Sequence, residues 1–130
     1  MEKKYSAEKP QTVELMGARR RLNYGVWKLS EAELQELWEQ EFEHTAPFEY
    51  FAKEHRYGYY SLEMGGARWN YNGLIEAIIR DKYTADEMEA TINNYLLDPE
   101  DEETAKAFNE MQAWRRFAKD TAKEVLGIKE

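Results

Sequence analysis

Residues 72–127 read NGLIEAIIRDKYTADEMEATINNYLLDPEDEETAKAFNEMQAWRRFAKDTAKEVLG, and their apolar side chains recur at the spacing of an α-helix. Thr84 and Glu87 form a capping-box pattern, in which each side chain bonds to the backbone amide of the other residue. Asp98-Pro99 interrupts the helical pattern, and Gly127 ends it. The pattern predicts three helices, at about 73–82, 84–97 and 100–126.

Upstream of this region the chain changes character twice. Ser30 and Glu33 form another capping box, which predicts a helix over about 30–45, and Pro47 can open a short helix over about 47–54. Before Ser30, apolar and polar side chains alternate on both sides of Gly17. This alternation predicts a β-hairpin over about 12–29.

The predicted fold is therefore α+β and mainly α, with an N-terminal β-hairpin packed on a bundle of four to five helices. We expect residues 1–11 to be a polar N-terminal lead-in and residues 12–130 to form a single domain. The segment 57–73 has two interpretations: a second hairpin that turns at Gly65-Gly66, or an ordered aromatic loop.

The composition excludes several classes of protein. The 130 residues contain no Cys, so disulfide frameworks, thiolate catalysis and Cys-based metal sites are absent. No apolar run reaches the roughly 18 residues of a membrane span, and Met1-Glu2-Lys3-Lys4-Tyr5 lacks the apolar stretch of a secretion signal. We expect an intracellular soluble protein with no membrane partner.

The net charge of −8 is unevenly distributed. Residues 1–29 carry seven basic and three acidic side chains, whereas residues 30–130 carry 11 basic and 23 acidic ones. Such an acidic chain repels phosphate backbones, so nucleic acid is an unlikely partner. The one compact basic run is Arg19-Arg20-Arg21, and its arginines could either neutralise acidic side chains of the same domain or bind a partner.

The two histidines offer little catalytic chemistry. Glu41 and His44 have the Glu-x-x-His spacing that contributes half of a di-iron site, but the second half is missing because Ala52 precedes His55 at that spacing. A zinc ion held by His44, His55 and Glu43 or Glu54 is the remaining possibility. We expect no catalytic residue, no metal and no cofactor, and an enzyme would have to use His44 or His55.

Eight aromatic side chains lie between residues 48 and 71. Tyr, Trp and Arg are the residue types that anchor protein interfaces, although the rings could equally cover the helical core. We predict that this segment, together with the hairpin arginines, binds a protein partner or a second copy of the chain. The predicted partner-binding residues are Tyr57, Tyr59, Tyr60, Arg68, Trp69, Tyr71, Arg19, Arg20 and Arg21.

Three runs of sequence carry a resemblance to a known group: Tyr71 to Ala90, Ile92 to Pro99 and Met111 to Lys119. Within residues 69–126 the chain resembles small acidic proteins encoded in phage and prophage regions of Bacteroides-type gut bacteria. That group has no assigned activity, so the resemblance implies a phage or mobile-element context and transfers no catalytic residue.

The expected function is that of a non-enzymatic protein–protein interaction protein that serves as a structural or assembly-associated component of a phage particle. The phage context implies a location in the cytoplasm of the bacterial host or in the virion. The alternative is an acidic inhibitor of a host defence protein, in which the Glu-rich helices at 30–44 and 98–110 imitate nucleic-acid phosphates.

Overall fold

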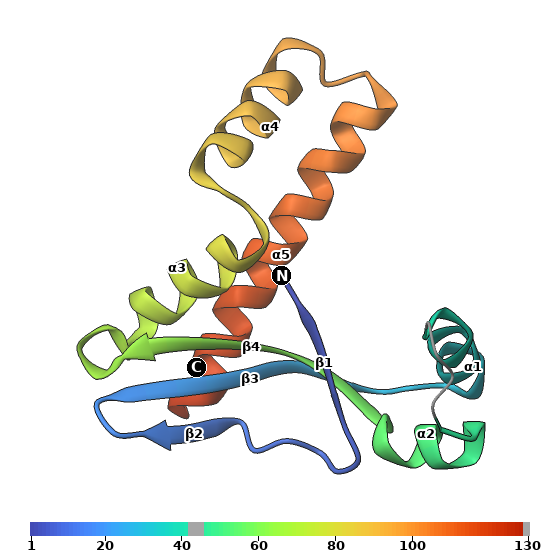
Figure 1. The fold of residues 1–130 in the computed structure, drawn as a ribbon. Helices are drawn as coiled ribbons and strands as arrows, with labels where there is room; N and C mark the ends of the chain where they lie inside the picture. The colour runs from blue at the N-terminus through green and yellow to red at the C-terminus, as the bar shows by residue number, and fades with distance from the viewer. Residues whose placement is uncertain (42–45, 129–130) are drawn as a thin grey trace. The chain divides into compact units, whose positions relative to one another are not determined.

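The computed structural model describes residues 1–41 and 46–128, in which three strands come before the first two helices and a fourth strand follows them (Figure 1). The elements are β1 (Lys3–Ser6), β2 (Val13–Met16), β3 (Arg19–Lys28), α1 (Glu31–Gln40), α2 (Phe48–Glu54), β4 (Tyr57–Gly65), the 3-10 helix η1 (Gly66–Arg68), α3 (Tyr71–Lys82), α4 (Ala85–Leu97) and α5 (Glu102–Leu126). They form two compact units, Met1–Glu63 and Met64–Glu130. Two such units can belong to one domain, so the expectation of a single domain over residues 12–130 stays a prediction.

The strands form one four-stranded sheet in the order β1-β4-β3-β2. β2 and β3 pair antiparallel as the predicted hairpin, with Met16 opposite Arg19. Gly17 takes a φ of +64° in the two-residue turn between them, a left-handed conformation that favours glycine. β1 pairs antiparallel with β4, placing Lys3 opposite Tyr60 and Ser6 opposite Tyr57.

The predicted fold class is wrong in where it places the strands. The hairpin is only half of the sheet, because β1 and β4 add strands from residues 3–6 and 57–65. The supposed lead-in of residues 1–11 thus contains an edge strand. An edge strand is held by backbone bonds to a single neighbour, and it needs no buried side chain; Lys3 and Lys4 of β1 are exposed. The alternation that identifies a half-buried strand was therefore missing.

The segment 57–73 matches neither of its two interpretations. β4 continues to Gly65, η1 follows, and α3 begins at Tyr71. The Asn70 side chain caps α3 by accepting a hydrogen bond of 2.9 Å from the amide of Gly73. Two glycines at 65 and 66 suggested a hairpin turn, but here they connect a strand to a helix.

In the first unit the capping box of α1 is confirmed. The Ser30 hydroxyl accepts from the amide of Glu33 at 3.2 Å, and the Glu33 carboxylate accepts from the amide of Ser30 at 3.2 Å. The helix expected over 30–45 ends at Gln40, and residues 42–45 lie outside the described part of the chain. α2 starts directly after Pro47, as expected for a helix that proline opens.

In the second unit, α3 and α5 pack along each other and contain most of its buried side chains (Figure 1). Leu74 and Ile78 of α3, and Met111 and Ala118 of α5, are completely buried. The indole N–H of Trp114 in α5 donates to the backbone carbonyl of Ile78 at 3.0 Å, which fixes the register of the two helices. The helices predicted at 73–82, 84–97 and 100–126 are confirmed to within two residues at each end.

The other helix of this unit, α4, packs on the N-terminal half of α5 without burying any residue (Figure 1). The Tyr95 and Phe108 rings stack between the two helices with centroids 4.1 Å apart. Leu96 is 71% exposed, and Leu97 is 85% exposed. We call this pair of helix segments, residues 84–110, the α4–α5 arm.

Candidate protein-interaction sites

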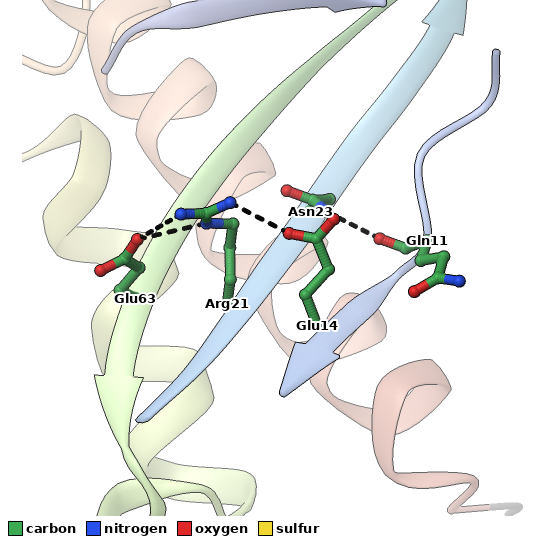
Figure 2. Close-up of polar contacts among 5 residues, drawn as sticks. All are labelled: Gln11, Glu14, Arg21, Asn23 and Glu63. Carbon is green, nitrogen blue, oxygen red and sulfur yellow. Dashed lines mark hydrogen bonds and ion pairs between the residues drawn. The ribbon is translucent and has the colours of Figure 1, made fainter. Parts of the chain in front are cut away.

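Arg21, one of the predicted partner-binding arginines, lies between two carboxylates of its own sheet (Figure 2). Its guanidinium donates to Glu63 of β4 at 2.8 Å and to Glu14 of β2 at 3.1 Å. The hydrogen bonds from Arg21 lower the pKa of Glu63, and the hydrogen bond to Glu63 raises the pKa of Arg21. Arg21 therefore joins three adjacent strands, as in the interpretation that the arginines neutralise acidic side chains of the same domain.

Asn23, two positions after Arg21 in β3, also forms hydrogen bonds within the first unit. Asn23 is 3% exposed, and its amide nitrogen donates to the backbone carbonyl of Gln11 at 2.7 Å (Figure 2). The backbone N–H of Asn23 donates to the carbonyl of Thr12 at 2.9 Å. These two bonds extend the attachment of β3 beyond the end of β2. Of the other two hairpin arginines, Arg19 is exposed and Arg20 is half-buried.

The tyrosines of β4 are half-buried, at positions 57, 59 and 60. The Tyr60 ring contacts those of Tyr24 and Trp27, with centroids 5.7 and 5.6 Å apart. Gly58 is buried under the Trp27 indole, and a Cβ atom at this position would overlap the indole ring. Part of the aromatic density therefore packs within the first unit.

The remaining predicted residues belong to the second unit. Arg68 forms an ion pair with Glu76 at 3.6 Å, and Trp69 and Tyr71 are half-buried. The nine predicted residues are thus divided between the two units. Their role in binding a partner stays a prediction.

His55 occupies the C-cap of α2, and its ring is used locally. The ring stacks on Phe51 with centroids 3.9 Å apart, and its Nδ1 lies 2.8 Å from the Phe51 carbonyl oxygen. His44 and Glu43, the other proposed zinc ligands, lie outside the described residues. Among residues 1–41 and 46–128, no group of three potential ligands could hold a metal ion. Nor does this part of the chain contain a helix that is both long and apolar enough to cross a membrane.

The first unit contains a cleft of about 350 Å³ between β1, the end of β3 and α1. Its walls include Trp27 and Glu33, and the Trp27 indole N–H donates to Glu33 at 3.3 Å. The hydrogen bond from the Ser30 backbone is the main cause that lowers the pKa of Glu33. Because this carboxylate already accepts from the helix cap and the indole, its geometry is explained by the cap of α1 without a ligand.

A different kind of surface lies on α5, which we call the basic groove. It has a volume of about 380 Å³, and no carboxylate of residues 1–41 or 46–128 lines it. Arg115 donates to Gln112 at 3.2 Å, and within the described residues none of the three cations of the groove pairs with a carboxylate. The residues of the basic groove are Phe108, Asn109, Gln112, Arg115, Arg116 and Lys119.

The α4–α5 arm has the opposite charge. Nine acidic side chains and one basic side chain give residues 84–110 a net charge of −8. Five of the acids lie in the six residues 98–103, all exposed and directly after Leu96 and Leu97. We call residues 96–103 the acidic end. Asp101 within it caps α5, and the hydrogen bonds from the hydroxyl and amide of Thr104 lower the pKa of Asp101.

The predicted partner-binding residues include neither the leucines of the acidic end nor the cations of the basic groove, although the alternative of an acidic inhibitor uses residues 98–110, which contain the carboxylates of the acidic end. The sequence offers one signal for the former, because Leu96 and Leu97 are adjacent and two consecutive residues of a helix point about 100° apart. At least one of the two leucines therefore has to leave a narrow apolar stripe. For the basic groove the sequence offers only a partial signal, which is the recurrence of Arg115, Arg116 and Lys119 on one side of a helix.

The chain was also compared with known proteins. No protein-family model, curated protein or solved structure was found to match it.

Proposed function

We propose that the protein is a non-enzymatic interaction protein that binds its partner through the acidic end of the α4–α5 arm. In its biological setting it serves as a structural or assembly-associated component of a phage particle. The phage setting is supported by the resemblance within residues 69–126.

The observation that carries the binding proposal is the exposure of Leu96 and Leu97, at 71% and 85%. Burying one leucine side chain contributes about 1.5–3 kcal/mol, so two adjacent leucines left in water are a strong incentive to bind another surface. α4 itself has no buried residue, which leaves its apolar side chains without a core of their own. A helix of this kind gains stability when a further element covers it.

The test is an affinity capture from lysate of a phage-carrying host, with three forms of the protein compared side by side. These are the unmodified protein, Leu96→Ser/Leu97→Ser, and the control Leu15→Ser/Met16→Ser. The control changes another exposed apolar pair, on β2. We expect the unmodified protein and the control to capture the same virion proteins, and the Leu96/Leu97 variant to lose them. Identical captures from all three forms would refute the assignment to the acidic end.

The net charge of −8 on the arm favours one alternative, an acidic inhibitor that binds a basic host nuclease in place of nucleic acid. In this case the captured protein would be basic, and its binding would weaken steeply as the salt concentration rises. Binding that is insensitive to salt would exclude the inhibitor. The same capture experiment, eluted with a salt gradient, separates the two functions.

A further inference from the structure

The second unit carries two surfaces of opposite charge, one on α5 and one where the chain passes from α4 to α5. The basic groove holds Arg115, Arg116 and Lys119, and the acidic end holds five carboxylates without a lysine or arginine. The groove is unusual for a chain with 26 acidic and only 18 basic side chains. Within the described part of the chain, none of the acidic side chains lines it. Three cations close together repel each other, so an anionic group that enters the groove gains from all three.

We infer that the basic groove of one copy of the chain binds the acidic end of a second copy. This inference rests on the proposed function, because both use the exposed leucines of the acidic end. It names the partner as the chain itself.

The acidic end cannot reach the groove of its own chain. The acidic end continues into the first turn of α5, which begins at Glu102 and runs as one helix past Lys119. Glu103 and Arg115 are 12 positions apart, which corresponds to roughly 18 Å along the helix axis at 1.5 Å per residue. A continuous helix holds the two surfaces at this separation, so the complementary charge has to come from another molecule.

The chemistry of the two surfaces is complementary beyond their charge. Leu96 and Leu97 offer apolar area next to the carboxylates. The groove offers the half-buried ring of Phe108 and the aliphatic stems of its arginines and lysine, which can cover apolar surface while their charged groups pair with carboxylates. Arginine in particular can hold a carboxylate through two hydrogen bonds at once.

When the groove of one copy binds the acidic end of another, the pair still has one unoccupied groove and one unoccupied acidic end. The contact is heterologous, so it can either close when the second copy returns the same contact or continue to a third copy. Repeated assembly of this kind agrees with a structural component that is present in many copies.

Charge reversal tests the contact directly. The first variant, Arg115→Glu/Arg116→Glu/Lys119→Glu, reverses the groove, and the second, Asp98→Lys/Glu100→Lys/Glu102→Lys, reverses the end while keeping the Asp101 cap. The control, Glu31→Lys/Glu36→Lys/Glu39→Lys, changes three exposed carboxylates of α1. It shifts the net charge from −8 to −2, by the same six units as the second variant, and so controls for general repulsion.

Sedimentation velocity of the purified proteins, at about 20 mM and about 500 mM NaCl, measures the outcome. We expect the unmodified protein and the control to associate at low salt and to dissociate at high salt. Each reversed variant alone should sediment as a monomer, and an equimolar mixture of the two should associate again, because each now supplies the charge that the other lacks. Circular dichroism of each variant shows whether the helices are intact.

An unmodified protein that remains monomeric at low salt overturns the inference. So does a mixture of folded reversed variants that fails to associate. Either result leaves the proposed function standing if Leu96→Ser/Leu97→Ser still loses its captured virion proteins, because those proteins would then be the partner. If self-association is absent and Leu96→Ser/Leu97→Ser also keeps its captured virion proteins, the proposed function is refuted as well.

Discussion

At the scale of single residues, the first unit depends on the absence of a side chain at position 58. Gly58 of β4 is buried under the Trp27 indole, and a Cβ atom there would lie within 2.7 Å of three indole carbons. Indole and strand therefore approach as closely as glycine alone permits.

We expect Gly58→Ala to destabilise the protein by about 1–3 kcal/mol, because the indole has to move out of its position. Urea unfolding followed by circular dichroism gives the change in the free energy of unfolding. Gly65→Ala is the matched control in the same strand, since a Cβ atom at Gly65 meets nothing within 4 Å. Equal midpoints for Gly58→Ala and the unmodified protein would contradict the packing of Trp27 on Gly58.

Single substitutions should also distinguish buried from exposed apolar residues in the second unit. Ile78→Ala removes three carbon atoms from a completely buried side chain and should cost about 2–5 kcal/mol. Leu97→Ala removes as many atoms from a side chain that is 85% exposed, and should leave the free energy of unfolding within about 0.5 kcal/mol. Urea unfolding of dilute samples in high salt measures both, so that self-association does not contribute.

At the scale of helices, the caps decide where each one begins. The Thr84 hydroxyl accepts from the amide of Glu87 at 3.1 Å, and the Glu87 carboxylate accepts from the amide of Thr84 at 3.4 Å. Such caps can be predicted from sequence because the interacting residues are three positions apart. By contrast, Asn70 and Asn72 both precede the apolar residues of α3, and the spacing alone does not show that Asn70 is the cap.

We expect Thr84→Ala to cost about 1 kcal/mol, because α4 loses its N-terminal hydrogen bond. Thr91→Ala in the same helix is the control. The Thr91 hydroxyl donates to the Glu87 carbonyl at 2.8 Å, which is already bonded within the helix, so its loss should be close to neutral. Thermal unfolding monitored at a helical wavelength compares the two, and a larger loss for Thr91→Ala would show that the cap is not what stabilises α4.

The cap of α5 should respond to pH. The Asp101 carboxylate accepts hydrogen bonds from the Thr104 hydroxyl at 2.7 Å and from the Thr104 amide at 2.9 Å, and these lower its pKa in the folded protein. A lowered folded pKa gives stability that is present above the unfolded pKa of about 4 and is lost as the pH falls through the folded pKa. Asp101→Asn keeps an acceptor for the cap and does not titrate.

We therefore expect the unmodified protein to lose stability relative to Asp101→Asn when the pH falls from about 5 to about 2. Melting temperatures of both proteins across this range measure the difference, which removes the contribution of the other carboxylates. If the melting temperatures of the two proteins fell in parallel with pH, Asp101 would have the same pKa in the folded and unfolded chains.

At the scale of the whole molecule, the sequence predicted local structure better than long-range pairing. Both capping boxes, the hairpin turn at Gly17 and the three C-terminal helices depend on residues close together in the chain. The pairing of β1 with β4 joins residues 3–6 to residues 57–60, and no local pattern indicates it. Exposure was equally hard to predict, because the helical spacing of Leu96 does not show that its side chain is 71% exposed.

Deletion of residues 1–7 tests the importance of this pairing. It removes β1 and leaves the backbone of Tyr57 to Tyr60 without its neighbour, as an exposed edge rich in tyrosine. We expect the shortened protein to be less stable and to aggregate, because an uncovered strand edge pairs with other chains. Light scattering during incubation measures the aggregation. A deletion variant that stays clear and melts like the full chain would show that β1 is dispensable.

The pairing of β1 with β4 also has a consequence for the order of events during synthesis. The ribosome releases the N-terminus first, so residues 3–6 emerge long before their partner at residues 57–60 exists. The β2–β3 hairpin and α1 need only nearby residues and can form during this interval. β1 must wait, and contacts between distant residues form slowly. The first of the four strands to be translated is thus among the last to find its place in the sheet.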